Sequence, residues 1–357
     1  MTELLRPVLR TAEPYATADV GTAVDLSDNT NLWGAPPAAV EAIRALDGAA
    51  LARYPALPPA ALCDAMAAYA GVSTDMIVAG CGSDDLIDGA MRTFAEPGDT
   101  IAFATPTFSM VPAFAAINGL RAHGVPFRAD LDLDVDRLLE PRPRIVYLCS
   151  PNNPTGSPVP EASIRRVLDE APGVVVLDEA YGEFTRAPGF ALVARYPNLV
   201  VLRTFSKAFG LAGLRVGYAV LDSSLAPALE TVRGPYKVNA AAAAAATAAM
   251  TGGLEWVRAR AEEAVANRTR VAGRLAAMGF SPLPSAANFL CVPCREAARA
   301  AARLLDRGFA LRVLRSLPPI TAALAASQGS ALRITVGPWP VMERLLAELQ
   351  PEAAACA

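Results

Sequence analysis

The chain has 357 residues, of which 53% are hydrophobic and 19% charged, and its formal net charge is −3. This balance is typical of a globular chain and excludes a basic surface for nucleic acid, while the length allows one large domain or two of ordinary size. The first ten residues carry Glu3, Arg6 and Arg10 and no apolar run, so we expect no signal peptide. No stretch is both long and apolar enough to be expected to span a membrane.

Helical patterns and short apolar runs alternate between residues 36 and 235. The apolar runs are bounded by Gly, Pro or polar residues, as in strands buried on both faces of a parallel sheet. Strands that alternate with helices predict an α/β domain with a mostly parallel sheet. We predict strands at 76–79, 100–104, 145–149, 174–177, 199–204 and 216–220, and helices at 38–46, 59–69 and 86–94.

The remainder of the chain predicts a different arrangement. An alanine-rich helix is expected at 240–250, because alanine is the strongest helix former, and a long charged helix at 255–278. An α+β pattern follows, which indicates a second, smaller domain. It consists of predicted strands at 288–292, 310–313 and 332–336, helices at 295–307 and 341–349, and a flexible loop at 318–329.

Metal chemistry has little support in this sequence. The only histidine is His123, near a predicted helix-to-strand transition and without a nucleophile motif, so we expect a structural histidine and no metal site. The six cysteines are scattered, which suits a reducing cytoplasm. Cys291 and Cys294 have the spacing of a redox motif, but they belong to a predicted strand, and we expect no redox role.

Polar residues follow several of the predicted strands, where an open parallel sheet binds its ligands. The segment 79–86 joins a strand to a helix and contains Gly82 and Ser83. It either presents a helix N-terminus to an anion or is ordinary helix capping. Asn153 follows the strand at 145–149 within Asn-Pro-Thr-Gly. Its amide either forms only the turn or holds a hydroxyl or carbonyl group of a ligand.

Asp178 ends the apolar strand at 174–177. A carboxylate at the end of a buried strand requires a cationic or hydrogen-bonding partner. That partner is either a cation of the protein, in a structural ion pair, or the protonated pyridine nitrogen of a ligand.

Lysine is rare here, since only two lysines occur among 32 Lys and Arg residues, and Lys207 lies in an unusual setting. It follows Thr204 and Ser206 and precedes Arg215, and two hydroxyls with an arginine fork suit a phosphate. A lysine amine can form a Schiff base, whereas arginine cannot lose its proton. The alternative is a surface lysine left by arginine-rich composition, which describes Lys237. Together the four positions supply what pyridoxal phosphate requires.

The ordered motifs of the chain closely resemble those of fold-type I pyridoxal-phosphate enzymes of the class I/II aminotransferases, nearest to the histidinol-phosphate aminotransferase branch. The resemblance covers nearly the whole chain. It implies an α/β fold with a large α/β/α domain at 31–239, a mostly parallel central sheet, and a smaller α+β domain at 1–30 and 240–357. The motifs lie at 29–34 (Asn-Thr-Asn-Leu-Trp-Gly), 53–55 (Arg-Tyr-Pro), 80–85 (Gly-Cys-Gly-Ser-Asp-Asp), 153–156, 178–181, 206–215 and 332–337.

The resemblance also implies roles for single residues. Lys207 would form the Schiff base with the cofactor and move the substrate's proton, and Asp178 would keep the pyridine nitrogen protonated. Asn153 and Tyr181 would bind the phenolic oxygen of the cofactor, and Phe108 would stack on its ring. The phosphate would be held by Gly82, Ser83, Thr204, Ser206 and Arg215. Asp84 belongs to the same loop as Ser83, and its carboxylate would point away from the phosphate. Tyr54 would reach the phosphate of the neighbouring subunit of a homodimer. Substrate would be bound by Arg333, by Arg312 or Arg315, and by Tyr15 and Asn31.

Some positions depart from the branch. Phe108 replaces its usual tyrosine, and the connection from Arg312 and Arg315 to Arg333 looks longer than usual. We expect an enzyme that moves an amino group between a donor, histidinol phosphate or an amino acid, and a 2-oxo acid such as 2-oxoglutarate. An aromatic or other specialised amino acid remains an alternative donor. Two further hypotheses are the decarboxylation of a phosphorylated amino acid on the same scaffold and a non-catalytic cofactor-binding module.

Overall fold

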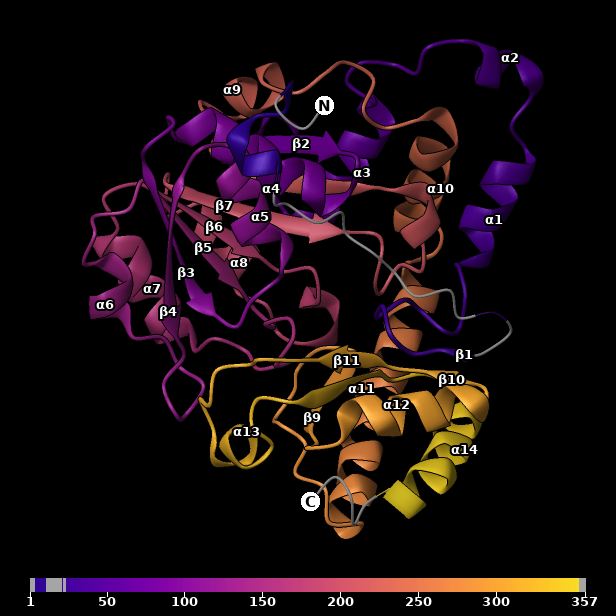
Figure 1. Cartoon of the computed structure of the whole chain (residues 1–357). Helices are drawn as coiled ribbons and strands as arrows, with labels where there is room; N and C mark the ends of the chain where they lie inside the picture. The colour runs from indigo at the N-terminus through magenta and orange to yellow at the C-terminus, as the bar shows by residue number, and fades with distance from the viewer. Residues whose placement is uncertain (1–3, 11–20, 22–23, 353–357) are drawn as a thin grey trace.

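The computed structural model describes residues 4–10, 21 and 24–352. A large sheet fills one part of the molecule, and a small sheet with its helices forms the other (Figure 1). The long helix α11 (Leu254–Ala277) begins at the larger part and runs into the smaller one. Within the described ranges, no helix is long and apolar enough to cross a membrane.

The large sheet has seven strands in the order β2-β8-β7-β6-β5-β3-β4. β8 runs antiparallel to both of its neighbours, and the other neighbouring pairs are parallel, so the predicted mostly parallel sheet is confirmed. The strands are β2 (Ile77–Gly80), β3 (Thr100–Thr105), β4 (Arg121–Pro126), β5 (Ile145–Cys149), β6 (Val174–Asp178), β7 (Leu199–Thr204) and β8 (Gly217–Leu221).

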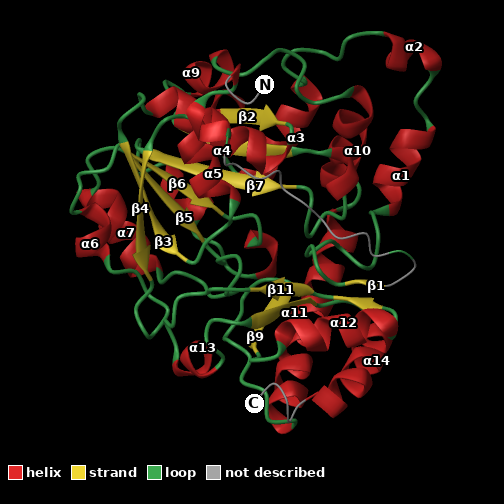
Figure 2. Ribbon diagram, in the orientation of Figure 1, coloured by secondary structure: helices red, strands yellow, loops and turns green. Residues whose placement is uncertain are grey.

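Helices cover both faces of this sheet (Figure 2). Successive residues of a strand point to opposite faces, so Val146 and Leu177 belong to one apolar core and Tyr147 and Val176 to the other. The first core includes residues of α3 (Ala60–Ala70), α6 (Val135–Leu139), α7 (Glu161–Glu170), α8 (Gly189–Val193) and α10 (Ala240–Thr251). The second includes residues of α4 (Gly82–Phe94), α5 (Met110–Ile117) and α9 (Ala226–Thr231). The short helices α1 (Pro37–Arg44) and α2 (Gly48–Ala52) precede α3.

The smaller part has its own apolar core and an antiparallel sheet in the order β11-β12-β9. The early strand β1 (Val24–Asp25) pairs with β10 (Phe309–Ala310), so these two early residues lie in the smaller part. Its other elements are β9 (Phe289–Pro293), α12 (Ala297–Asp306), β11 (Arg312–Leu314), α13 (Ala322–Ala326), β12 (Ala331–Thr335) and α14 (Trp339–Leu349).

Two local expectations differ from the structure. The strand predicted at 310–313 is divided, because Phe309 and Ala310 pair with β1 whereas Arg312 to Leu314 pair with β12. The loop predicted at 318–329 contains the short helix α13, whose first turn is capped by the Thr321 hydroxyl, the acceptor from Leu324 N at 3.2 Å. His123 lies on β4, where its Nε2 is 2.9 Å from the Arg137 carbonyl oxygen.

Candidate active site

The segments that follow β2, β3, β5, β6 and β7 meet the small sheet around a cavity of about 590 Å³. The carboxyl ends of parallel strands lie at one edge of a sheet, which explains why residues far apart in sequence meet here. From the large part, the lining includes Ser83, Asp84, Phe108, Asn153, Asp178, Tyr181, Thr204, Ser206, Lys207 and Arg215. From the small part it includes Arg312, Arg315 and Arg333.

Lys207 extends into this cavity from the loop after β7. Its Nζ donates to the carbonyl oxygen of Asp28 at 2.8 Å and lies 6.0 Å from the centre of the Tyr181 ring. Burial among the cavity walls, assisted by the positive charge of Arg333, lowers the pKa of Lys207 from 10.5 to about 8. A neutral amine is therefore accessible near neutral pH, as a carbonyl-reactive lysine requires.

Asp178 lies at the floor of the cavity with only 3% of its surface exposed. Its Oδ2 accepts a hydrogen bond from the Tyr147 hydroxyl at 2.6 Å, and its Oδ1 accepts from the backbone N–H of Ala180 at 3.0 Å. No ion pair joins it to any residue that the structure describes. Burial raises its pKa to about 6. The arrangement fits a cationic ligand group better than a structural ion pair.

Tyr181 and Asn153 lie on the wall between Lys207 and the small sheet. The Tyr181 hydroxyl accepts from Asn29 Nδ2 at 3.0 Å, and Asn153 Oδ1 accepts from Arg333 Nη1 at 2.6 Å. Burial raises the pKa of Tyr181 above its ordinary value, so this phenol stays protonated and able to donate. Both side chains can therefore donate hydrogen bonds to an oxygen held near Lys207.

The N-terminus of α4 forms an anion cradle beside Arg215. Gly82 has a φ of +79°, and a Cβ on it would lie 2.7 Å from Arg215 Nη2, so only glycine leaves this space open. Arg215 Nη1 donates to Ser206 Oγ at 3.4 Å. The free N–H groups of the first helical turn and the guanidinium suit a phosphate.

Asp84 is oriented differently from the expectation. It lines the cavity, and its Oδ2 lies 3.4 Å from Arg215 Nη2, so the carboxylate points towards Arg215 instead of turning away from the cradle. Burial raises the pKa of Asp84, because it penalises the charged form more than Arg215 favours it.

Three arginines cover the cavity from the small sheet. Arg312 on β11 and Arg333 on β12 are register partners in an antiparallel pair, and Arg315 follows β11 at the surface. Arg333 Nη2 also donates to the carbonyl oxygen of Ser27 at 2.6 Å, which fixes its guanidinium. The structure thus brings Arg312 and Arg315 to the same cavity, although the sequence left the choice between them open.

Three of the predicted site residues that the structure describes, Gly82, Asn31 and Tyr54, do not line this cavity, although Gly82 lies beside Arg215, which does. The amide of Asn31 is used within the protein, where it donates to Ala208 O at 2.9 Å and accepts from Trp33 N at 3.0 Å, and its predicted contact with substrate stays a prediction. Tyr54 is 81% exposed and stacks on Tyr236, in a separate surface hollow. Tyr15 lies outside the described residues.

Two residues at the cavity were missed by sequence reasoning. Asn29, two positions before Asn31, is the asparagine that reaches the cavity and bonds Tyr181. The motif at 29–34 contained both asparagines, and nothing in its pattern distinguished them. Tyr147 lies inside an apolar run, and this pattern predicts only a core residue, although its hydroxyl contacts Asp178.

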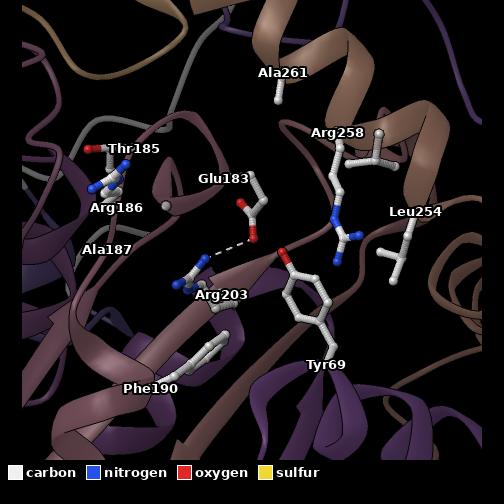
Figure 3. A pocket seen from close by; sticks show the side chains of 12 residues that line it. Tyr69, Glu183, Thr185, Arg186, Ala187, Phe190, Arg203, Leu254, Arg258 and Ala261 are labelled. Atoms are coloured by element: carbon white, nitrogen blue, oxygen red, sulfur yellow. Dashed lines mark hydrogen bonds and ion pairs between the residues drawn. The ribbon is translucent and has the colours of Figure 1, made fainter.

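A second cavity, of about 400 Å³, lies where α3, β7 and the start of α11 meet, and Tyr69, Glu183, Arg203 and Arg258 line it (Figure 3). Arg203 is buried and pairs with Glu183 at 2.9 Å and with Glu179 at 2.8 Å. No predicted site residue lines it, so the candidate chemistry belongs to the cavity around Lys207.

An amine of low pKa, a buried carboxylate without an ion pair and a phosphate cradle surround one cavity in this fold. The residues therefore fit pyridoxal phosphate, and fold and site define a fold-type I enzyme that depends on it. The family model of "Aminotransferase class I and II" matches residues 22–349, so the chain belongs to that family. It is a pyridoxal-phosphate-dependent aminotransferase.

Individual relatives agree with this assignment. The chain is 38% identical to a histidinol-phosphate aminotransferase of Roseiflexus castenholzii, over 87% of this chain and 90% of the relative. It is 41% identical to an aromatic amino acid aminotransferase of Rhodococcus jostii, over 82% and 84%. The solved histidinol-phosphate aminotransferase of Sinorhizobium meliloti, in complex with pyridoxal-5'-phosphate, superposes with a TM-score of 0.87 at 27% identity, over 99% and 98% of the two chains.

Proposed function

We propose that the enzyme transfers the amino group of histidinol phosphate to a 2-oxo acid such as 2-oxoglutarate. The observation that carries this proposal is the arginine wall of Arg312, Arg315 and Arg333 opposite Lys207. Five basic and three acidic side chains line the cavity, so its lining favours anionic substrates. A phosphate ester and a dicarboxylate both supply anionic groups for guanidinium forks.

Each residue of the cavity has a task in this proposal. Pyridoxal phosphate supplies an aldehyde that takes up the amino group and a ring that accepts electrons from the reacting carbon. The Lys207 amine takes the proton from Cα of the amino donor and returns it on the cofactor side. Asp178 holds a positive charge on the ring nitrogen, and Asn153 and Tyr181 donate to the phenolic oxygen. Gly82, Ser83, Thr204, Ser206 and Arg215 would hold the cofactor phosphate, and Phe108 would pack on the ring.

The arginines divide between the two ends of the substrate. Arg333 is held by Asn153 and Ser27, so we assign to it the group nearest the reacting carbon. Arg315 is exposed at the mouth of the cavity, and Arg312 is half-buried beside it. In histidinol phosphate, the group nearest the reacting carbon is the phosphate, its only anion, which is joined to that carbon through one CH2–O link; in an amino acid it is the α-carboxylate. We assign to Arg312 and Arg315 the second negative charge of the phosphate and the far carboxylate of 2-oxoglutarate.

A second candidate donor is an aromatic amino acid. Phe108, Met110, Phe114 and Leu317 give the cavity an apolar wall, which suits a phenyl or indole ring as well as an imidazole. The relative from Rhodococcus jostii carries that activity in its name. The two donors differ in the anion beside the reacting carbon, which is a phosphate with up to two negative charges in histidinol phosphate and a single carboxylate in phenylalanine.

The test is the first half-reaction, in which the donor alone reacts with the cofactor-loaded enzyme. In an Arg315→Gln variant, we expect the apparent affinity for histidinol phosphate to fall about tenfold or more, because a charge-assisted bond is lost. The reaction with phenylalanine should change little. Arg258→Gln, at the second cavity, is the control and should leave both donors unaffected. Equal losses with both donors would contradict the proposal.

We further propose that the enzyme is a cytoplasmic homodimer with shared active sites. The free thiols of Cys63, Cys81, Cys149 and Cys291 suit a reducing compartment, whereas Cys294 is disulfide-bonded. Leu51, Tyr54 and Tyr236 form an exposed apolar patch, and such a patch suits a second copy of the chain. In this arrangement Tyr54 contacts the cofactor phosphate of the neighbouring subunit.

A further inference from the structure

Tyr147 and Asp178 face each other beneath the cavity. β5 and β6 run parallel and in register, with Tyr147 opposite Val176 and Cys149 opposite Asp178. Because residues two apart share a face of a strand, Tyr147 and Asp178 lie on the side of the sheet covered by α4 and α5. Tyr147 is 1% exposed, and its hydroxyl donates to Asp178 Oδ2 at 2.6 Å.

The hydrogen bond from Tyr147 is important for Asp178 because this carboxylate has few other partners. Oδ1 already accepts from the backbone N–H of Ala180 at 3.0 Å, and the Tyr147 hydroxyl is the side chain that donates to Oδ2. The other titratable groups acting on this pair are Asp84 from α4, Arg203 from β7, Cys149 and Tyr181. None forms an ion pair with Asp178 within the described part of the chain. Without the Tyr147 hydroxyl, Oδ2 would lose this donor and would lie near the Cys149 thiol on the neighbouring strand.

We propose that Tyr147 is a positioning residue that keeps the Asp178 carboxylate ionised and aimed at the cofactor ring nitrogen. The inference rests on the proposed role of Asp178 and extends it to a residue that does not line the cavity. The hydroxyl occupies one lone pair of Oδ2 from below, which leaves another lone pair for a cationic N–H above. It also restricts rotation of the carboxylate.

The electrostatic consequence has a definite sign. Burial raises the pKa of Asp178 to about 6, and the Tyr147 hydrogen bond is the largest influence that opposes this rise. Removal of the hydroxyl raises the pKa further, so a larger share of Asp178 is protonated near neutral pH. A protonated carboxyl group carries no charge and cannot balance a cationic ring nitrogen.

The experiment compares Tyr147→Phe with Tyr218→Phe. Tyr218 is another buried tyrosine of the same sheet, and its hydroxyl oxygen has no hydrogen-bond partner in the described structure, so it is a matched control. The readout is the dissociation constant of pyridoxal phosphate at pH 6.5 and pH 8.5, measured by equilibrium dialysis. We expect Tyr147→Phe to weaken cofactor binding about tenfold at pH 6.5, and clearly less at pH 8.5, where the carboxyl group ionises again. Tyr218→Phe should match the parent at both values.

Asp178→Asn separates this inference from the proposed function. The double variant Tyr147→Phe/Asp178→Asn should bind cofactor as weakly as Asp178→Asn alone, because the hydroxyl acts through the carboxylate. An equal loss for Tyr147→Phe at both pH values, or no loss at either, would overturn the role of Tyr147. If Asp178→Asn bound pyridoxal phosphate like the parent, the proposed role of Asp178 itself would fail.

Discussion

Lys207 and Asp178 are buried in surroundings that disfavour the charged form of each side chain. Burial lowers the pKa of the Lys207 amine to about 8 and raises that of the Asp178 carboxyl to about 6. A buried ionisable group without an ion-pair partner reduces stability unless a ligand compensates for it. Shifts of opposite direction in one cavity are therefore typical of a site prepared for a charged reactant.

Asp178→Asn should stabilise the cofactor-free protein at pH 7.5. The folded pKa of Asp178 lies near 6, above its ordinary value of 3.8, so the folded state binds the proton more tightly than the unfolded state. The free energy of unfolding therefore falls as pH rises between these values and stays reduced above pH 6. Without this penalty, we expect the variant to gain about 2 kcal/mol at pH 7.5, with a smaller gain at pH 4.5. Thermal unfolding at both pH values measures it, and a less stable variant at pH 7.5 would contradict the raised pKa.

Capture of pyridoxal phosphate by the cofactor-free protein should depend on the protonation of Lys207. The neutral amine is the reactive form, so the rate should rise from pH 7 and level off above about pH 8, where Lys207 is deprotonated. Stopped-flow absorbance follows this rate. Lys207→Arg should give no covalent signal at any pH, because a guanidinium remains charged. A parent rate that keeps rising up to pH 9.5 would refute the lowered pKa, because it would indicate an amine near its ordinary value of 10.5.

At the scale of elements, hydrogen bonds from Arg233 fix the start of α4. This arginine is buried and donates to Asp85 Oδ2 at 2.7 Å and to Ala79 O at 3.0 Å. Asp85 Oδ2 in turn accepts from Cys81 N at 3.0 Å. The last residues of β2 and the first turn of α4 are therefore tied together, which holds the anion cradle open before a phosphate arrives.

Gly82→Ala should damage this cradle. The new Cβ would lie 2.7 Å from Arg215 Nη2, and the φ of +79° strains any residue with a side chain. We expect cofactor affinity to fall at least tenfold, or about 1.4 kcal/mol, with little change in secondary structure. Gly213→Ala is the control, because no atom lies within 4 Å of its Cβ position and its φ is not positive. Equal cofactor affinity in the two variants, measured by dialysis, would refute the role of the cradle.

At the scale of the whole molecule, the cavity lies where two separately built parts meet. The large sheet contributes Lys207 and Asp178, and the small sheet contributes Arg333. Residues of α11 belong to the cores of both parts, with Val257 in one and Val271 in the other. The helix therefore sets how the arginine wall faces the cofactor groups.

A mixing experiment tests the proposed shared site. Lys207→Ala and Tyr54→Ala should each be nearly inactive alone. When the two are unfolded together and refolded, mixed dimers would contain one site with both changes and one with neither, so about a quarter of parent activity should return. In a control for the refolding yield, Lys207→Ala is unfolded and refolded together with Tyr69→Phe instead of Tyr54→Ala. No recovery above the sum of the separate variants would contradict a shared site.

Much of the fold was predictable because buried parallel strands leave a clear pattern. The runs at 145–149 and 199–204 match β5 and β7, and the cofactor residues at their ends follow from the rule on carboxyl ends of strands. Contacts across the small part were not predictable. Asn29 rather than Asn31 reaches the cavity, because Asn29 N donates to the Thr335 hydroxyl on β12 and Asn29 O accepts from Asn288 Nδ2, just before β9. Such contacts leave no local signal in the sequence. The direction of the Asp84 carboxylate likewise depends on Arg215, 131 positions away.

The most direct measurement is a single-turnover spectrum of the cofactor-loaded enzyme mixed separately with histidinol phosphate and phenylalanine. We predict that histidinol phosphate converts the bound cofactor to its amino form faster, and that 2-oxoglutarate then restores the starting spectrum. The Lys207→Ala variant should show no conversion on this timescale. Conversion by phenylalanine at an equal or higher rate would contradict the proposed donor. Unimpaired conversion by Lys207→Ala would contradict the catalytic role of the lysine.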